Sequence, residues 1–450
     1  MAALGSRVSV VGGGFAGTEA AMLLARAGVP VDLWEMRPER KSPAHVSGDL
    51  AEIVCSNSFG GDSLATAAGV LKAEMRLFGS VTLECAARTA VGAGGALAVD
   101  REGFARTVTE RVGEEPLVRI VREEVLEPPP GLSILATGPL PADSVAAWLE
   151  SVVGPFLAFY DAASPIVFRE SIDMEKAYYA SRYGRGDPED YVNCPLDEEA
   201  YDRFWTELVA AERFVLRGFE KNAYFESCLP VEVIGSRGRD TLRFGPMRPV
   251  GLEDPRTGRR PFAVVQLRRD NAAGDLMNLV GFQTGLRWRE QKRIFRLVPG
   301  LERADFARYG VMHRNAFVKS PHVLADDTSL KDRPDVYLTG QMAGVEGYME
   351  SAALGLYTGL MVARRLRGLL PVLPPEETML GGLVRYIRNA DPENFQPMNA
   401  NFGLLPAPAE RIRGRGEKKA LQAEMAVRAM AAFLRESMPW IESPMVRSSV

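Results

Sequence analysis

A glycine-rich stretch near the N-terminus constrains the fold of this chain more than any other feature. Residues 8–17 read Val-Ser-Val-Val-Gly-Gly-Gly-Phe-Ala-Gly, so an apolar run leads into glycines in the G-x-G-x-x-G register and then into an alanine- and leucine-rich segment. Gly12 would permit a tight turn, Gly14 would let a pyrophosphate approach the backbone, and Gly17 would let helix and strand pack closely. The stretch therefore predicts a site for dinucleotide phosphates, because the free N–H groups and the dipole at a helix start favour anions.

An acidic residue lies where a dinucleotide site needs one. A second short strand, from Val29 to Trp34, leads directly to Glu35, whose carboxylate would hold a ribose hydroxyl. A glycine turn that binds nothing is the alternative for the glycines alone, but strand, helix and acid together favour a bound dinucleotide. The fold is therefore expected to be α/β with a Rossmann-type domain. The cofactor-binding residues expected here are Gly12, Gly13, Gly14, Phe15, Ala16, Gly17 and Glu35.

Two later segments indicate which dinucleotide is bound. Residues 132–138 read as a buried strand that ends in Ala-Thr-Gly, and residues 335–340 repeat the strand and end in Thr-Gly. Glycine-rich sequence and a helix of small residues follow, which would let that helix approach a sheet or a cofactor closely. An NAD enzyme needs only the first fingerprint, whereas the three segments together resemble the large FAD-containing reductase class. The resemblance implies FAD contacts at Gly138, Gly340, Gln341, Gly344 and Glu346.

The composition is that of ordinary globular protein and disfavours several classes. The 450 residues are 46% hydrophobic and 25% charged, and no apolar run is long enough to cross a bilayer. No leader is recognisable, so we expect a cytoplasmic protein without membrane association. Four cysteines without a C-x-x-C motif indicate a reducing compartment, and with only three histidines they predict no metal site. The net charge of −4 does not by itself predict nucleic-acid binding.

The chain is expected to contain an interrupted FAD-binding domain. Residues 1–158 would form its first part and residues 326–450 its second part, which ends in a helical segment with a clear pattern over 421–433. Between them, residues 159–325 would form an inserted α+β substrate domain, with strands near 262–267 and 276–282. Residues 237–251 are expected to be a loop because of their glycines and prolines.

The few cysteines and histidines are the first candidates for chemistry. Cys55 is followed at once by polar residues, which suits an exposed loop whose backbone N–H groups could depress a thiol pKa, and Cys228 also precedes a chain break. For each of them a small buried apolar role stays open, and for Cys85 and Cys194 it is the preferred interpretation. His313 could stack on a planar ligand or move a proton, or be a hydrogen-bonded structural residue.

Basic residues cluster twice, although the net charge is negative. Either cluster could contact phosphates, and either could equally be a solvated helix face. The two clusters are Arg287, Arg289, Lys292, Arg293 and Arg296, and Arg411, Arg413, Arg415, Lys418 and Lys419.

Several separated blocks, spread from residue 8 to about residue 406, resemble those of one known family. The blocks are residues 12–21, 35–38 (Glu-Met-Arg-Pro), 52–58 (Glu-Ile-Val-Cys-Ser-Asn-Ser), 94–101, 159–162, 238–247, 264–267, 311–315, 344–348 (Gly-Val-Glu-Gly-Tyr) and 396–406. The chain is similar to the folate- and FAD-dependent tRNA (uracil-5-)-methyltransferases, bacterial enzymes that make ribothymidine in the T loop. Blocks of this length are far more specific than a dinucleotide fingerprint alone.

The resemblance implies a reductive methylation of a tRNA uridine. Methylenetetrahydrofolate would supply the carbon, reduced FAD the reducing equivalents, and NADH or NADPH would recharge the flavin. The partners would be the T arm of tRNA, folate and the nicotinamide dinucleotide, without an obligatory protein partner. Arg37, in the block after Glu35, joins the expected FAD contacts.

The resemblance also assigns roles to the candidate residues. The family's two essential thiols correspond to Cys55 and Cys228. A thiolate that adds to uracil C6 makes C5 nucleophilic, and a base must later remove the C5 proton. We favour Cys228 as the nucleophile and Cys55 as the base. His313 would stack on the pterin or the nicotinamide. Expected contacts with tRNA phosphates are Arg287, Lys292, Arg413 and Arg415.

Two alternatives remain at this point. One is a related FAD protein that modifies the wobble uridine of tRNA with a GTPase partner, for which we would expect a longer chain with a larger C-terminal helical domain. The other is a non-catalytic flavoprotein that binds tRNA as a folding aid. The second predicts that Cys55→Ala and Cys228→Ala leave function intact.

Overall fold

A five-stranded parallel sheet organises the N-terminal and C-terminal parts of the chain. In the computed structural model, which describes residues 7–214, 224, 229–408, 412 and 414–440, this sheet has the strand order β16-β7-β1-β2-β6. Neighbouring strands pair in parallel, and all residues of β1 and β7 are buried. This is the expected Rossmann-type arrangement. The strands are β1 (Val8–Val11), β2 (Val31–Trp34), β6 (Val118–Val121), β7 (Ser133–Leu135) and β16 (Val336–Leu338).

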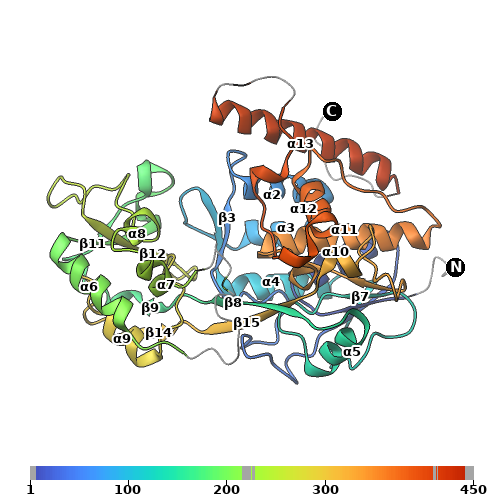
Figure 1. Ribbon diagram of the computed structural model, residues 1–450, viewed down its shortest axis with the longest axis horizontal. Coiled ribbons are helices and arrows are strands. Elements are labelled where there is room, and N and C mark those ends of the chain that lie inside the picture. The colour runs from blue at the N-terminus through green and yellow to red at the C-terminus, as the bar shows by residue number, and fades with distance from the viewer. Residues whose placement is uncertain (1–6, 215–223, 225–228, 409–411, 413, 441–450) are drawn as a thin grey trace.

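The helices around this sheet include a closely packed pair from opposite ends of the chain. Helix α11 (Tyr348–Leu366) packs against α1 (Phe15–Arg26), and a Cβ on Gly355 would collide with the backbone of Ala16. The small residues in α11 thus allow the close approach expected from the sequence. Figure 1 shows α13 crossing the top of this part of the molecule, above α2 and α12. The other helices here are α2 (Ala67–Phe78), α3 (Val81–Arg88), α4 (Arg101–Gly113), α5 (Asp143–Val153), α10 (Ser320–Val323), α12 (Met379–Asn389) and α13 (Arg415–Ser437).

A second, antiparallel sheet forms a separate body at the left of Figure 1, with its own hydrophobic core. Its strands follow the order β10-β11-β12-β13-β9-β14 and all lie between residues 166 and 308. The strands are β9 (Ile166–Phe168), β10 (Tyr178–Tyr179), β11 (Tyr191–Leu196), β12 (Ala263–Arg269), β13 (Leu276–Leu279) and β14 (Phe306–Arg308). Helices of this region are α6 (Glu198–Ala210), α7 (Val231–Ser236), α8 (Thr241–Phe244) and α9 (Trp288–Phe295).

Two small sheets complete the architecture. Strands β8 (Leu157–Ala162) and β15 (Met312–Phe317) pair antiparallel and run between the two large sheets. A three-stranded sheet is formed by β3 (Ser58–Gly61), β4 (Ala90–Val91) and β5 (Ala96–Val99). The expected domain boundaries at residues 158 and 325 stay a prediction, although the ribbon of β8 and β15 lies close to both.

The prediction of a loop over residues 237–251 is partly wrong, because this segment contains the short helix α8. Buried Leu242 holds this turn in the second core, and its carbonyl accepts a hydrogen bond from Met247 N (2.8 Å). None of the helices in the described residues has the length and hydropathy of a membrane span. The same residues contain no cluster of three or more metal-ligand side chains.

Candidate functional site

The glycine fingerprint leaves open space at Gly14, just before the start of α1. Gly12 has a φ of +109°, and a Cβ there would collide with the carbonyl of Ala136 at the end of β7. A Cβ on Gly17 would collide with Gly12 itself, whereas a Cβ on Gly14 would have no atom within 4 Å. The backbone is therefore compact behind the turn and open in front of the helix N-terminus, which fits a pyrophosphate.

Glu35 is an ionised, fixed acceptor beside this opening. Its carboxylate accepts hydrogen bonds from Gly13 N (3.0 Å) and from Arg37 Nε (2.9 Å) and Nη2 (3.0 Å). Burial alone would raise the pKa of Glu35, but the hydrogen bonds and charge of Arg37 outweigh burial and hold it below its usual value. The charged carboxylate can still accept hydrogen bonds from ribose hydroxyls.

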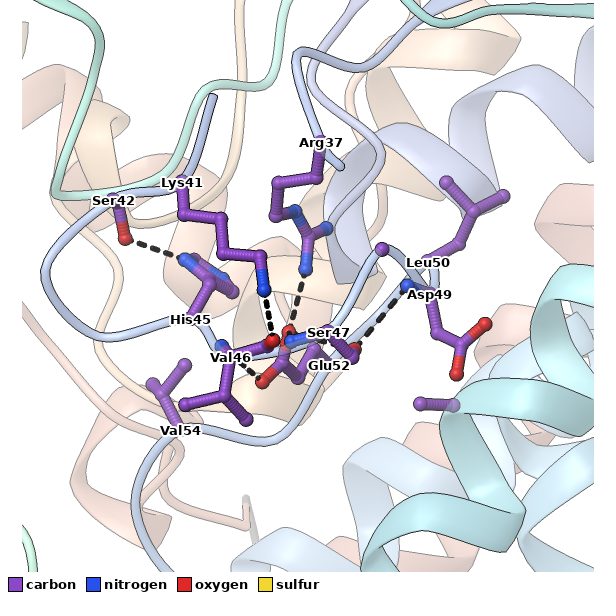
Figure 2. A network of polar contacts seen from close by, with 12 residues as sticks. Arg37, Lys41, Ser42, His45, Val46, Ser47, Asp49, Leu50, Glu52 and Val54 are labelled. Atoms are coloured by element: carbon purple, nitrogen blue, oxygen red, sulfur yellow. Dashed lines mark hydrogen bonds and ion pairs between the residues drawn. The ribbon is translucent and has the colours of Figure 1, made fainter. Parts of the chain in front are cut away.

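A polar network connects this acid to the loop that carries Cys55. Arg37 Nη1 donates to Glu52 Oε2 (2.9 Å), three positions before the thiol residue. Figure 2 shows Glu52 also accepting from Val46 N (2.8 Å) and from Ser47 N (3.1 Å) and Oγ (2.9 Å). Arg37 thus pairs with two buried carboxylates. It therefore connects Glu35, which is bonded to the fingerprint, with the loop that carries Cys55.

The three segments expected to contact FAD meet at one edge of the parallel sheet. Strands β1, β7 and β16 pair in parallel, so the residues after each of them lie at the same, carboxyl edge. Gly138 follows β7 with open space at its Cβ position, and Gly340 and Gln341 follow β16 in a short 3₁₀ helix. Gln341 donates to the carboxylate of buried Glu346.

Cys55 lies beside the start of α11, held by Tyr348. The tyrosine Oη is 3.0 Å from Cys55 Sγ and accepts hydrogen bonds from Cys55 N (2.9 Å) and Val54 N (3.0 Å). The Tyr348 ring stacks on Phe15 of the fingerprint, with ring centroids 4.5 Å apart. The half-buried thiol of Cys55 is therefore connected through Tyr348 to the glycine fingerprint.

Opposing effects set the ionisation of this thiol. Burial raises the pKa of Cys55 to about 11, and the charge of Asp161 adds to the rise. The hydrogen bond from Tyr348 and the positive charge of Arg101 act in the other direction. Asp161 also raises the pKa of Glu346, whose carboxyl is already disfavoured as an anion by burial. Cys55, Asp161 and Glu346 therefore form one electrostatically linked group.

His313 belongs to the same region through strand pairing. In the β8–β15 ribbon it lies directly opposite Asp161. Its Nε2 atom is buried and has no hydrogen-bond partner in the described part of the chain. Burial, aided by the charge of Arg308, lowers the pKa of His313, so the imidazole is neutral at pH 7. A neutral ring with a free buried nitrogen suits contact with a planar heterocycle.

Not all of the predicted residues are brought together. Cys228 and Arg413 lie outside the described residues, and Arg415 is the first residue of α13. Arg287 occupies the N-cap position of α9 and its side chain pairs with Glu212 at 3.4 Å, whereas Lys292 is exposed on the same helix. The other cations of this cluster also have partners: on α9, Arg289 pairs with Glu212 and Arg293 with Glu207 and Glu290, and just after the helix Arg296 donates to Ala304 O.

Reasoning from sequence missed three residues that contact Cys55 or act on the charge of its thiol. Tyr348, Asp161 and Arg101 each lie inside a block that carried the family resemblance, but none had been assigned a role. Their position within such a block was the one sign in the sequence that these residues could belong to the site. Their proximity to Cys55 depends on contacts between distant parts of the chain. Cys85 and Cys194, in contrast, are fully buried, in agreement with the buried apolar role that the sequence favoured for them.

The chain matches a known protein family over most of its length. The family model "Glucose inhibited division protein A" matches residues 7–369. Aquifex aeolicus GidA has a similar fold, with a TM-score of 0.70 at 16% identity over 96% of this chain and 73% of that one. A protein of Desulforudis audaxviator is 55% identical and one of Thermus thermophilus 53% identical, covering 95% and 97% of this chain and 98% of each relative. Both are named methylenetetrahydrofolate–tRNA-(uracil-5-)-methyltransferase TrmFO, and this chain belongs to the TrmFO family.

Proposed function

We propose that this protein is a methylenetetrahydrofolate-dependent tRNA (uracil-5-)-methyltransferase that forms 5-methyluridine in the T loop. The observation that carries the proposal is the 55% identity to a relative of that name over 95% of this chain and 98% of the relative. The site supports it independently, because the thiol of Cys55 is fixed to Tyr348, whose ring stacks on the fingerprint residue Phe15.

FAD is the dinucleotide that these residues fit. The open space at Gly14 would take the pyrophosphate, ionised Glu35 the ribose, and the segment from Gly340 to Glu346 the flavin side. When bound and reduced by NADH or NADPH, FAD would supply the hydride equivalent that turns the transferred carbon into a methyl group. The role of the protein would be to hold the flavin ring near Cys55 and to exclude water from that ring.

The two thiols would divide the proton and carbon chemistry. Addition of the Cys228 thiolate to uracil C6 places negative charge on C5 and O4, so that C5 can attack the methylene carbon of the folate. Removal of the C5 proton then lets the bond between that carbon and the folate nitrogen break, and once the carbon has been reduced to a methyl group the C6–S bond breaks and releases the Cys228 thiolate. Cys55 would be that base; burial raises its pKa to about 11, so Tyr348, Arg101 and the bound ligands must favour its thiolate for it to take a proton at neutral pH.

His313 would position the folate. Burial keeps its imidazole neutral, and its unpartnered buried Nε2 gives a planar ligand both a stacking face and a hydrogen-bonding group. Replacement of His313 by Ala should weaken folate binding and leave FAD bound, measured by folate titration of the purified yellow protein. Unchanged folate affinity would contradict this role.

Contacts with tRNA are proposed from the cations that the sequence indicated. Lys292 is exposed on α9, and with Arg287 and the residues Arg413 and Arg415 it would neutralise backbone phosphates. The carboxylates that pair with the α9 arginines reduce what that helix offers to RNA. The target uridine must leave its stack to reach Cys55, so the T loop would be bound with its base extruded.

The test is a complete reaction with purified protein and defined tRNA. An unmodified transcript, methylenetetrahydrofolate and NADH should yield 5-methyluridine in the T loop, and no product should form when the T-loop uridine is replaced by cytidine. Cys55→Ala should abolish product, whereas Cys194→Ala, a buried thiol of the second core, should not. A FAD-containing protein that forms no 5-methyluridine would contradict the proposal and leave the non-catalytic flavoprotein as the better account.

A further inference from the structure

Arginine side chains converge on the backbone of the loop that carries Cys55. Arg101, the first residue of α4, donates to Ile53 O (2.7 Å) and to Cys55 O (2.8 Å). Arg308 Nη2 donates to the carbonyl between them, that of Val54, at 3.3 Å. Three successive carbonyls of this loop are therefore held by guanidinium groups.

The other side of the Arg101 guanidinium is fixed by the second sheet. Nε and Nη2 of Arg101 donate to the two oxygens of Asp270 at 2.9 Å and 2.8 Å, and Arg101 N donates to Asp270 O (3.3 Å). Asp270 follows β12 directly and its side chain is 2% exposed. One side chain thus links the thiol loop in the first part of the chain to the antiparallel sheet.

Further contacts on the far side of Cys55 strengthen this link. Arg268, on β12, donates to Ser56 Oγ (3.0 Å) and Asn57 Oδ1 (2.8 Å). The amide of Asn57 donates in return to Arg269 O (3.0 Å). The end of β12 therefore contacts both the residue holding the Cys55 carbonyl and the two residues after the thiol.

The chemistry of a guanidinium explains why arginine occupies position 101. Its planar fork makes two parallel bonds to a carboxylate and still has donors left for two carbonyls, which a lysine ammonium cannot reproduce. Without Arg101, the buried Asp270 carboxylate and two loop carbonyls would lose their partners at once.

We propose that Arg101, oriented by Asp270, is a positioning residue of the methylation reaction, which fixes the backbone at Cys55 and makes the thiol's place depend on docking of the antiparallel sheet. The inference rests on the proposed function of Cys55. It adds to that function a specific connection between the region expected to hold the substrate and the reacting thiol.

The charges of the Arg101–Asp270 pair give a test that a merely structural role would not pass. Alkylation of Cys55 by iodoacetamide, followed by mass spectrometry of its peptide, measures the thiolate fraction as a function of pH. Arg101→Gln removes a positive charge and should move the profile to higher pH, and Asp270→Asn should move it to lower pH, each by about one pH unit. Shifts in the same direction, or none, would overturn the proposal.

Turnover gives the second test, with retained FAD absorbance as the control for folding. Arg101→Lys keeps the charge but loses the fork, so kcat for tRNA methylation should fall about 10- to 100-fold with little change in the KM for tRNA. The matched control is Arg76→Lys, which alters a bidentate surface pair with Asp62 and touches no residue of the thiol loop. Wild-type kcat in Arg101→Lys would contradict the positioning role, whereas full activity of Cys55→Ala would instead refute the proposed function.

Discussion

At the scale of single residues, the site depends on a thiol whose surroundings act against each other. Burial and Asp161 favour the neutral thiol of Cys55, whereas Tyr348 and Arg101 favour the thiolate. Tyr348 has the most direct influence, because its hydroxyl contacts both the sulfur and the backbone N–H of Cys55. The reactivity of Cys55 should therefore respond to removal of a single hydroxyl group.

Tyr348→Phe should slow alkylation of Cys55 at fixed pH. The hydrogen bond to the sulfur lowers the pKa of Cys55, so its loss should raise that pKa further and reduce the alkylation rate about 2- to 10-fold, in line with a bond of about 1 kcal/mol. Tyr386→Phe, which removes a hydroxyl bonded to Gln396 O, is the matched control and should leave the rate unchanged. A faster reaction in Tyr348→Phe would show that the hydroxyl protects the thiol instead.

At the scale of helices and strands, two buried contacts hold the scaffold of the site. Glu74 on α2 accepts hydrogen bonds from Met379 N and Leu380 N, the first residues of α12. Gly355 allows α11 to lie directly on α1. Both contacts join the N-terminal part of the chain to the part after residue 325, and both can be tested by a single substitution.

Glu74→Gln should change the pH dependence of stability. Burial raises the pKa of Glu74 to about 8, so between its ordinary pKa, near 4.5, and pH 8 the folded state still holds a proton that the unfolded state has lost. Wild-type stability should therefore fall over that interval relative to Glu74→Gln, and the difference should be constant above pH 8. Thermal unfolding of both proteins from pH 5 to 9 measures this. The exposed Glu110→Gln on α4, which removes the same charge, should show no such trend.

Gly355→Ala should separate α1 from α11. The added Cβ would collide with the carbonyl of Ala16, so we expect a loss of about 1–3 kcal/mol in unfolding free energy and weaker FAD retention. Gly416→Ala on α13, where a Cβ meets no atom within 4 Å, should be neutral or slightly stabilising. Equal stability of the two variants would contradict the close packing described for α11.

At the scale of the whole molecule, local patterns could be predicted and long-range contacts could not. The strand at Val8–Val11 and helix α1 follow from hydrophobic runs and glycine spacing, and α13 follows from its helical periodicity. The contact between Cys55 and Tyr348 joins residues 293 positions apart, and no periodicity encodes such a pairing. The α9 cations were equally visible in sequence, but their carboxylate partners on α6 and beyond became apparent only in three dimensions.

Binding of tRNA should depend on salt, and Lys292 should account for part of that dependence. Lys292→Ala should reduce the slope of log Kd against log salt by about one and weaken binding without altering which base is methylated. Lys176→Ala, which removes a surface cation paired with Glu302 at 2.7 Å, is the control. An unchanged slope in Lys292→Ala would show that Lys292 on α9 does not contact RNA phosphates.

The ribbon of β8 and β15 has a consequence for how such a protein could have arisen. Leu157, where β8 begins, lies opposite Phe317, where β15 ends, so the chain leaves the parallel sheet and rejoins it at neighbouring points. A segment whose two ends are adjacent can be lengthened, exchanged or lost without rerouting the rest of the polypeptide. The region between β8 and β15 can thus change in length or sequence, while β16 and the helices that complete the parallel-sheet part after residue 325 keep their path.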